Sequence, residues 1–195
     1  MMPIEPMSSM TPLFALLAIA AVAAMYVIAT YNGLVSLRNR VKEAFSDIGV
    51  QQKRRHDLIP NLIETVKGYA SHESKTLQGV TEARTKAIQA AQTGDAKGIA
   101  AAENALSSAL KSVFAVAEQY PDLKANQNFL HLQQELVDAE DKIQAARRFY
   151  NQNVQLLKTK VEQFPSNMIA GMFGFSAEAF FAIDAAETAV PQVKF

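Results

Sequence analysis

Cysteine and tryptophan are absent from this 195-residue chain, and glycine is scarce, with eight residues. Without cysteine there is no disulfide, no thiolate metal site and no cysteine nucleophile. The shortage of glycine and the lack of tryptophan argue against a turn-dense β fold. Alanine, glutamine, lysine and glutamate dominate the polar stretches, and these residues favour helices. Because 19 basic residues balance 19 acidic ones, no global field attracts nucleic acid.

Basic residues are also missing from the first 37 positions, where Glu5 is the only charged side chain. The uncharged run over residues 10–31 is long enough to cross a hydrocarbon core of about 30 Å at about 1.5 Å per residue. It predicts a transmembrane helix at residues 11–31 behind a short tail at 1–10. The alternatives are a cleaved signal peptide, which requires a basic segment before the apolar run, and a buried core helix, which rarely lacks a polar face over this length.

Residues 32–165 show the three-and-four spacing of apolar side chains that indicates amphipathic helices. Pro60 predicts a break or kink between Arg55 and Pro60, giving two helices or one bent helix. Residues 93–95 read as a loop, followed by a helix over 96–118. A long apolar seam over 129–164 predicts the last helix. Long seams joined by short loops favour an all-α, antiparallel up-down bundle of the four-helix type. The expected inner positions include Tyr69, Ala101, Leu106, Leu110, Leu136, Ile143 and Phe164.

The C-terminal segment, residues 166–195, is apolar, interrupted by glycine, and too short to span a bilayer. We expect it to pack on the bundle as a plug, with Phe173 and Phe175 buried. The alternative is an exposed patch that contacts membrane or protein.

Several ordered motifs extend over nearly the whole length of the chain. They are YNGLV (31–35), LRNRV (37–41), QKRRHDLIPNL (52–62), VKGYA (66–70), TEAR (81–84), EQYPDLKA (118–125), EDKI (140–143) and RRFYN (147–151). With these motifs the chain resembles the bacterial LemA family. The resemblance implies a small membrane-anchored protein with an antiparallel helical bundle, and it brings no catalytic residues with it. One branch of the family is linked to magnetosome biogenesis, and no residue here points to that branch.

Basic residues follow the apolar run directly, six against two acids over residues 38–55. The positive-inside rule therefore favours an outside N-terminus and a cytoplasmic bundle at the bacterial inner membrane, with the opposite orientation left open. Arg38, Arg40 and Lys42 either set this topology alone or also contact anionic lipid.

A cluster of polar residues is the candidate interaction site, with a structural role as the alternative. In the structural interpretation, Arg55 pairs with Asp57, and Asn61 caps backbone groups freed by Pro60. Charges near the seam of the last helix are expected to pair across the bundle, since buried charges are costly alone. The cluster comprises Arg54, Arg55, Asp57, Asn61, Arg84, Glu118, Glu140 and Arg147.

The functional expectation is a non-enzymatic, membrane-anchored scaffold or adaptor. Its partners would be membrane lipid and either a protein or further copies of the chain, not nucleic acid. The alternatives are an accessory regulatory subunit of a membrane or envelope enzyme or protease complex, and a small-ligand-binding bundle. No catalytic, cofactor or metal residues are predicted, because the histidines lack ligand-spaced neighbours.

Overall fold

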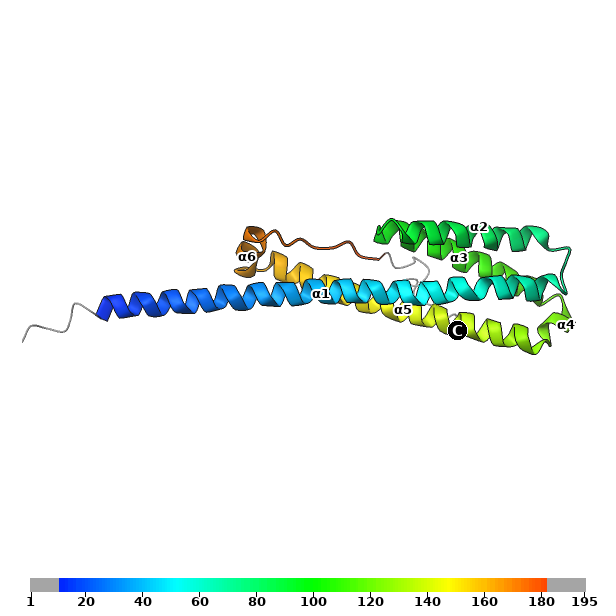
Figure 1. Ribbon diagram of the computed structural model, residues 1–195, viewed down its shortest axis with the longest axis horizontal. Helices are drawn as coiled ribbons and strands as arrows, with labels where there is room; N and C mark the ends of the chain where they lie inside the picture. The colour runs from blue at the N-terminus through cyan, green and yellow to red at the C-terminus, as the bar shows by residue number, and fades with distance from the viewer. Residues whose placement is uncertain (1–10, 182–195) are drawn as a thin grey trace, which may run out of the picture. The chain divides into compact units, whose positions relative to one another are not determined.

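The computed structural model describes residues 11–181, and all regular structure in that range is helical (Figure 1). The expected all-α fold is therefore confirmed. The predicted tail at residues 1–10 and positions 182–195 of the C-terminal segment lie outside the described residues. The helices are α1 (Thr11–Lys67), α2 (Ser74–Ala91), α3 (Ala96–Ala117), α4 (Pro121–Lys124), α5 (Gln127–Glu162) and α6 (Ser166–Met172).

The described residues form two compact units. The anchor unit contains residues 11–40 and 155–178, and the bundle unit contains residues 41–154 and 179–181. Helices α1 and α5 each contribute to both units, and α2, α3 and α4 belong to the bundle unit.

Within the bundle unit, successive long helices run in alternating directions, as an up-down bundle requires (Figure 1). The predicted loop at 93–95 is confirmed. Gly94 adopts a φ of 71°, which disfavours side chains with a Cβ, and Asp95 caps α3 by accepting hydrogen bonds from the backbone N–H groups of Lys97 and Gly98. The bundle core is an apolar cluster that includes Leu62, Val66, Val80, Leu106, Leu110, Val113, Leu123 and Leu136.

Of the two alternatives at Pro60, the separation into two helices is wrong, because α1 continues through Pro60 as one helix to Lys67. Pro60 has no N–H with which to bond the carbonyl of His56, four residues earlier. The side chain of Arg84 on α2 supplies the missing donor, with its Nε 2.8 Å from the His56 oxygen. A tertiary hydrogen bond thus replaces the lost helical one.

The predicted seam positions are mostly buried, with three exceptions. Ala101 is exposed on α3, and Tyr69 and Phe164 are also exposed. The inner face of α3 runs instead through Ile99, Glu103 and Leu106, whose spacings of four and three match a helical stripe. A charged residue therefore occupies a core position.

The predicted plug is only partly present. Phe175 is buried in the anchor unit, but Phe173 is about half exposed, contrary to the expectation. Phe181, which was not singled out, packs into the bundle unit, where its ring lies 5.1 Å from that of Tyr150 and 5.8 Å from that of Phe45. The side-chain amide of Asn151 also bonds the Phe181 backbone at both N–H and C=O.

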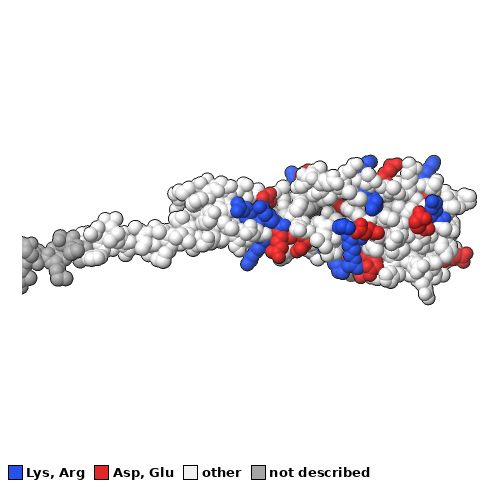
Figure 2. Space-filling view, viewed as in Figure 1, with Lys and Arg blue, Asp and Glu red and all other residues white. Residues whose placement is uncertain are grey.

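The N-terminal stretch of α1 is apolar and exposed along its length, and it is the one helix among the described residues long and apolar enough to cross a membrane. Figure 2 shows that charged side chains gather over the bundle unit, while this stretch carries none.

Candidate functional site: a buried polar network

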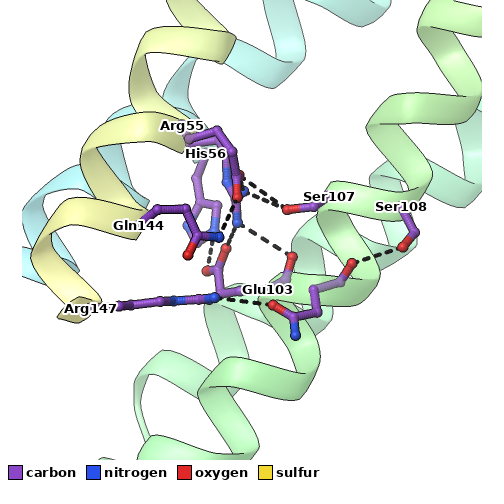
Figure 3. A network of polar contacts seen from close by, with 9 residues as sticks. Arg55, His56, Glu103, Ser107, Ser108, Gln144 and Arg147 are labelled. Atoms are coloured by element: carbon purple, nitrogen blue, oxygen red, sulfur yellow. Dashed lines mark hydrogen bonds and ion pairs between the residues drawn. The ribbon is translucent and has the colours of Figure 1, made fainter. Parts of the chain in front are cut away.

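Arg55 is the centre of a polar network inside the bundle unit (Figure 3). Its side chain is 1% exposed, and it occupies a core position of α1 between Ile48 and Leu62. The guanidinium donates to the carboxylates of Glu103 on α3 and Glu140 on α5, and to Ser107 Oγ at 2.9 Å. One arginine therefore joins three helices of the bundle.

Glu103 is fully buried, so its charge depends entirely on protein partners. Besides Arg55, the partner is His56, whose Nε2 lies 2.9 Å from Glu103 Oε1. Burial, reinforced by the charges of Arg55 and Arg84, lowers the pKa of His56 from 6.5 to about 4. His56 is therefore neutral at pH 7, and because a carboxylate only accepts, its Nε2 carries the proton.

Glu140 completes the network on α5, with a side chain that is 34% exposed. It accepts from Ser107 Oγ at 3.1 Å and from Gln144 Nε2 at 3.0 Å. Burial lowers the pKa of Arg55, and the charge of Glu140 opposes that effect. Each carboxylate oxygen of Glu140 thus has a donor.

Arg147 lies close to this network and is also buried. Its Nη1 donates to Asn104 Oδ1 at 3.1 Å, and its guanidinium lies over the ring of Phe181 at 5.8 Å. The charge of Arg147 contributes to the lowered pKa of Arg55. Two cations, Arg55 and Arg147, therefore lie in the same part of the bundle as the two carboxylates described above.

A cleft of about 440 Å³ opens beside the network. Its polar wall includes Arg55, Ser107 and Glu140, and its apolar wall includes Phe114 and Leu136. Among the residues that the structure describes, no three histidine or acidic side chains gather in the way that a metal ion would need. The arrangement cross-links helices, and Glu140, which is 34% exposed, is its most accessible carboxylate.

The structure brings together Arg55, Glu140, Arg84 and Arg147 from the predicted cluster. It separates the others from this network. Arg54 pairs with Glu135, and Asp57 pairs with Lys53 at 2.6 Å instead of with Arg55. Asn61 is exposed, and the carbonyl freed by Pro60 is bonded by Arg84. Glu118 pairs with Lys124 at the surface rather than across the bundle. Arg38, Arg40 and Lys42 are exposed.

Sequence reasoning missed Glu103 and the role of His56. Glu103 had a detectable signal, since it continues the apolar spacing of Ile99, Leu106 and Leu110 on α3. A charged residue at such a position predicts a buried partner. His56 had no such signal, because its contact depends on how α1 is rotated against α3.

Comparison with known proteins matches a LemA family model to residues 44–195, which is most of the chain. The chain belongs to the LemA family. It is similar to Protein LemA of Metamycoplasma hominis, with 29% identity over 140 residues, covering 71% of this chain and 63% of that protein. It is also similar to Magnetosome protein MamQ 2 of Paramagnetospirillum magneticum, with 24% identity over 178 residues, covering 80% of this chain and 65% of that protein.

Magnetosome protein MamQ of Magnetospirillum gryphiswaldense is similar at 23% identity over the same length of alignment. The chain thus spans slightly less than two thirds of the length of these curated relatives. The family match agrees with the helical bundle, and the relatives' names identify no reaction.

Proposed function

We propose that this LemA family chain is a single-pass, membrane-anchored scaffold that acts through protein and lipid contacts rather than by catalysis. The observation that carries the proposal is the continuity of α1. One helix of 57 residues contains the apolar stretch and also supplies a core helix of the bundle, without a non-helical linker. A tether that only concentrated an enzyme at the membrane would not need this continuity.

The polar network supports a structural role for the buried charges. Arg55 and Glu103 bond to each other and to neighbouring side chains inside the bundle, where a substrate would have to displace them. Buried pairs of this kind contribute little net stability but penalise helix arrangements that leave a charge unpaired. The network is thus suited to fixing one register of α1, α3 and α5.

The proposed location is the bacterial inner membrane, with the bundle in the cytoplasm. The support is the basic flank at residues 38–55, following a segment whose only charged side chain is Glu5. The chain has no cysteine, so Lys97→Cys gives a unique label site on an exposed position of α3. An impermeant thiol reagent should label it only after cell lysis. Labelling in intact cells would reverse the proposed orientation.

Site-specific photo-crosslinking in cells tests the scaffold itself. Crosslinkers would replace exposed apolar residues of the bundle unit, at Val50, Val137 and Phe149. Matched controls would sit at the exposed charged positions Lys86 and Lys97. A scaffold should give discrete protein adducts at a subset of the apolar positions and none at the controls. The absence of any protein adduct would refute the proposal, and an adduct with a membrane enzyme or protease would favour the accessory-subunit alternative.

A second candidate, a small-ligand-binding bundle, is favoured by the 440 Å³ cleft. Arg55 lines this cleft, and its Nε atom is buried with no hydrogen-bond partner among the described residues. A ligand with one acidic group and an apolar body would match the cleft's two walls. Native mass spectrometry of the full chain from membranes would reveal a retained small molecule, and Glu140→Gln should alter its retention if it occupies the cleft.

A further inference from the structure

The surface of the anchor unit carries four exposed apolar side chains around α6. Phe164, Met168 and Met172 are 75%, 64% and 77% exposed, and Phe173 is 49% exposed. We call these four residues the α6 apolar face. Met168 and Met172 are one helical turn apart, while Ile169 and Ala170 between them are buried. The helix therefore has one side in the protein and a second apolar side that nothing in the anchor unit covers.

Charge is absent from this part of the chain. Residues 163–177 contain no acidic or basic side chain, and Figure 2 shows an uncharged surface where α6 lies beside α1. A protein-docking patch usually has a polar rim that fixes orientation. Within residues 163–177 the α6 apolar face has polar neighbours such as Asn167 but no charged ones, a composition that suits a non-directional apolar environment.

The position of α6 beside α1 decides which apolar environment this is (Figure 1). The Phe173 ring lies 4.8 Å from the ring of Tyr31, the last residue of the predicted transmembrane segment. The neighbouring Phe175 ring lies 5.7 Å from Tyr31 and 5.2 Å from the guanidinium of Arg38, the first cation after that segment. Arg38 follows Tyr31 by seven positions, a rise of about 10 Å along the helix. These contacts place α6 at the level where the apolar stretch gives way to charge.

The backbone at the end of α6 is closed by internal hydrogen bonds. Phe175 donates to the Ala170 carbonyl at 2.9 Å, across Gly174, which adopts a φ of 68°. At the start of the segment, Ser166 Oγ donates to the Lys160 and Gln163 carbonyls at 2.7 and 2.8 Å. Backbone N–H and C=O groups without a hydrogen-bond partner are costly in an apolar medium. The bonds at the two ends of α6 satisfy several of these groups within the protein.

We propose that the α6 apolar face inserts into the boundary between headgroups and acyl chains of the same bilayer that α1 spans. This rests on the proposed membrane anchoring, and it adds a second, lateral lipid contact to it. Helices that carry residues such as Phe on an apolar face settle at this depth without crossing the membrane. Arg38 and Arg40, which are exposed on α1, would lie near the lipid phosphates and favour anionic headgroups.

The chain contains no tryptophan, so one introduced tryptophan reports the depth of its own position. The test uses the full chain in vesicles of phosphatidylcholine and phosphatidylglycerol whose acyl chains carry bromine, a fluorescence quencher, near the headgroup. Met172→Trp places the probe on the α6 apolar face. Met25→Trp places it on the apolar stretch of α1, and Val50→Trp on the bundle unit. All three native side chains are exposed, at 77%, 62% and 61%, so the substitutions disturb no core.

We expect quenching of Met172→Trp and Met25→Trp by the brominated lipids and none of Val50→Trp. Quenching of Met25→Trp without quenching of Met172→Trp would leave the anchor intact and overturn the inference. If that unquenched Met172→Trp were also shielded from aqueous iodide, a protein surface or second copy would cover α6 in place of lipid. If Met25→Trp itself were unquenched, the proposed anchoring would fall and the inference with it.

Discussion

Removing the charge of Glu103 should destabilise the bundle more than removing the charge of Glu140, the other carboxylate that Arg55 contacts. Glutamine keeps the volume of glutamate, so Glu103→Gln changes charge and hydrogen bonding with little change in packing. The side chains of Arg55 and Glu103 are 1% and 0% exposed. Water therefore cannot solvate the Arg55 guanidinium after it loses the Glu103 carboxylate. Breaking a buried pair by removing one partner costs about 3–5 kcal/mol. Arg55 keeps Glu140 as a partner, which places the expected loss at the lower end, about 3 kcal/mol.

Glu140→Gln is the matched control, because it removes the other carboxylate from the same arginine. The Glu140 side chain is 34% exposed, and Arg55 retains the buried Glu103. Glu140→Gln should therefore cost about 1 kcal/mol, as the loss of a partly solvated ion pair does. Arg55→Met should be the most damaging change, since it leaves Glu103 buried with only the neutral His56 beside it.

The double variant Arg55→Met, Glu103→Leu tests whether the loss comes from an unpaired charge. It removes both charges of the buried Arg55–Glu103 pair and leaves Glu140, which reaches solvent. It should be more stable than Arg55→Met alone, because replacing a buried pair by apolar side chains is often neutral. The double-mutant cycle then gives a coupling free energy of about 2 kcal/mol or more between the two positions.

Urea unfolding of the full chain in mild detergent, followed by far-ultraviolet circular dichroism, measures these free energies. The reasoning predicts the order of stability Glu140→Gln, Glu103→Gln, Arg55→Met, from most to least stable. A loss below about 1 kcal/mol for Glu103→Gln would show that water reaches the network. Equal losses for the two glutamine variants would show that burial does not distinguish the carboxylates.

Three further predictions use the same assay. Arg84→Met should cost about 1–3 kcal/mol by leaving the His56 carbonyl unbonded, and Pro60→Ala should reduce that cost by restoring the helical donor; equal costs in both backgrounds would contradict this explanation. The pKa of His56 is lowered from 6.5 to about 4 in the folded chain, so the unfolded state binds more protons between these values, and stability should fall by about 3 kcal/mol as pH drops through that window. His56→Gln should flatten that part of the pH profile, and an unchanged profile would reject the assignment. Leu136→Ala and Ile143→Ala, both buried in the seam of α5, should each cost about 2–5 kcal/mol, and losses under about 1 kcal/mol would mean that the core is misplaced.

The helices of this chain are predictable because their determinants are local. Apolar spacing is repeated over many turns along 129–164, and the structure places α5 at Gln127–Glu162. The loop before α3 was likewise marked by Gly94 and Asp95, whose backbone conformation and capping are properties of neighbouring residues. The apolar run of α1 needs only length and composition to be recognised.

Pro60 shows where local reasoning fails. Its missing N–H predicts a break or kink, yet α1 continues as one helix, and a donor from Arg84, 28 residues away from His56 in sequence, replaces the lost bond. The partner of Arg55 was misassigned for the same reason: Asp57 is close in sequence, but the spacing of a helix directs it to Lys53 at the surface. The two C-terminal phenylalanines that were both predicted to be buried also differ, since Phe175 is buried and Phe173 is half exposed.

The amino-acid sequence by itself determined the elements of this protein: an uncharged N-terminal run, amphipathic helices and the loops between them. Only the tertiary structure decided which polar groups meet, since Arg55, Glu103 and Glu140 lie on three helices and 48 and 85 positions separate the arginine from the two carboxylates. Periodicity states which face of a helix is apolar, but it does not state the rotation and axial offset of one helix against another. Pairing across helices depends on those two quantities, and they are set by the packing of the whole bundle core.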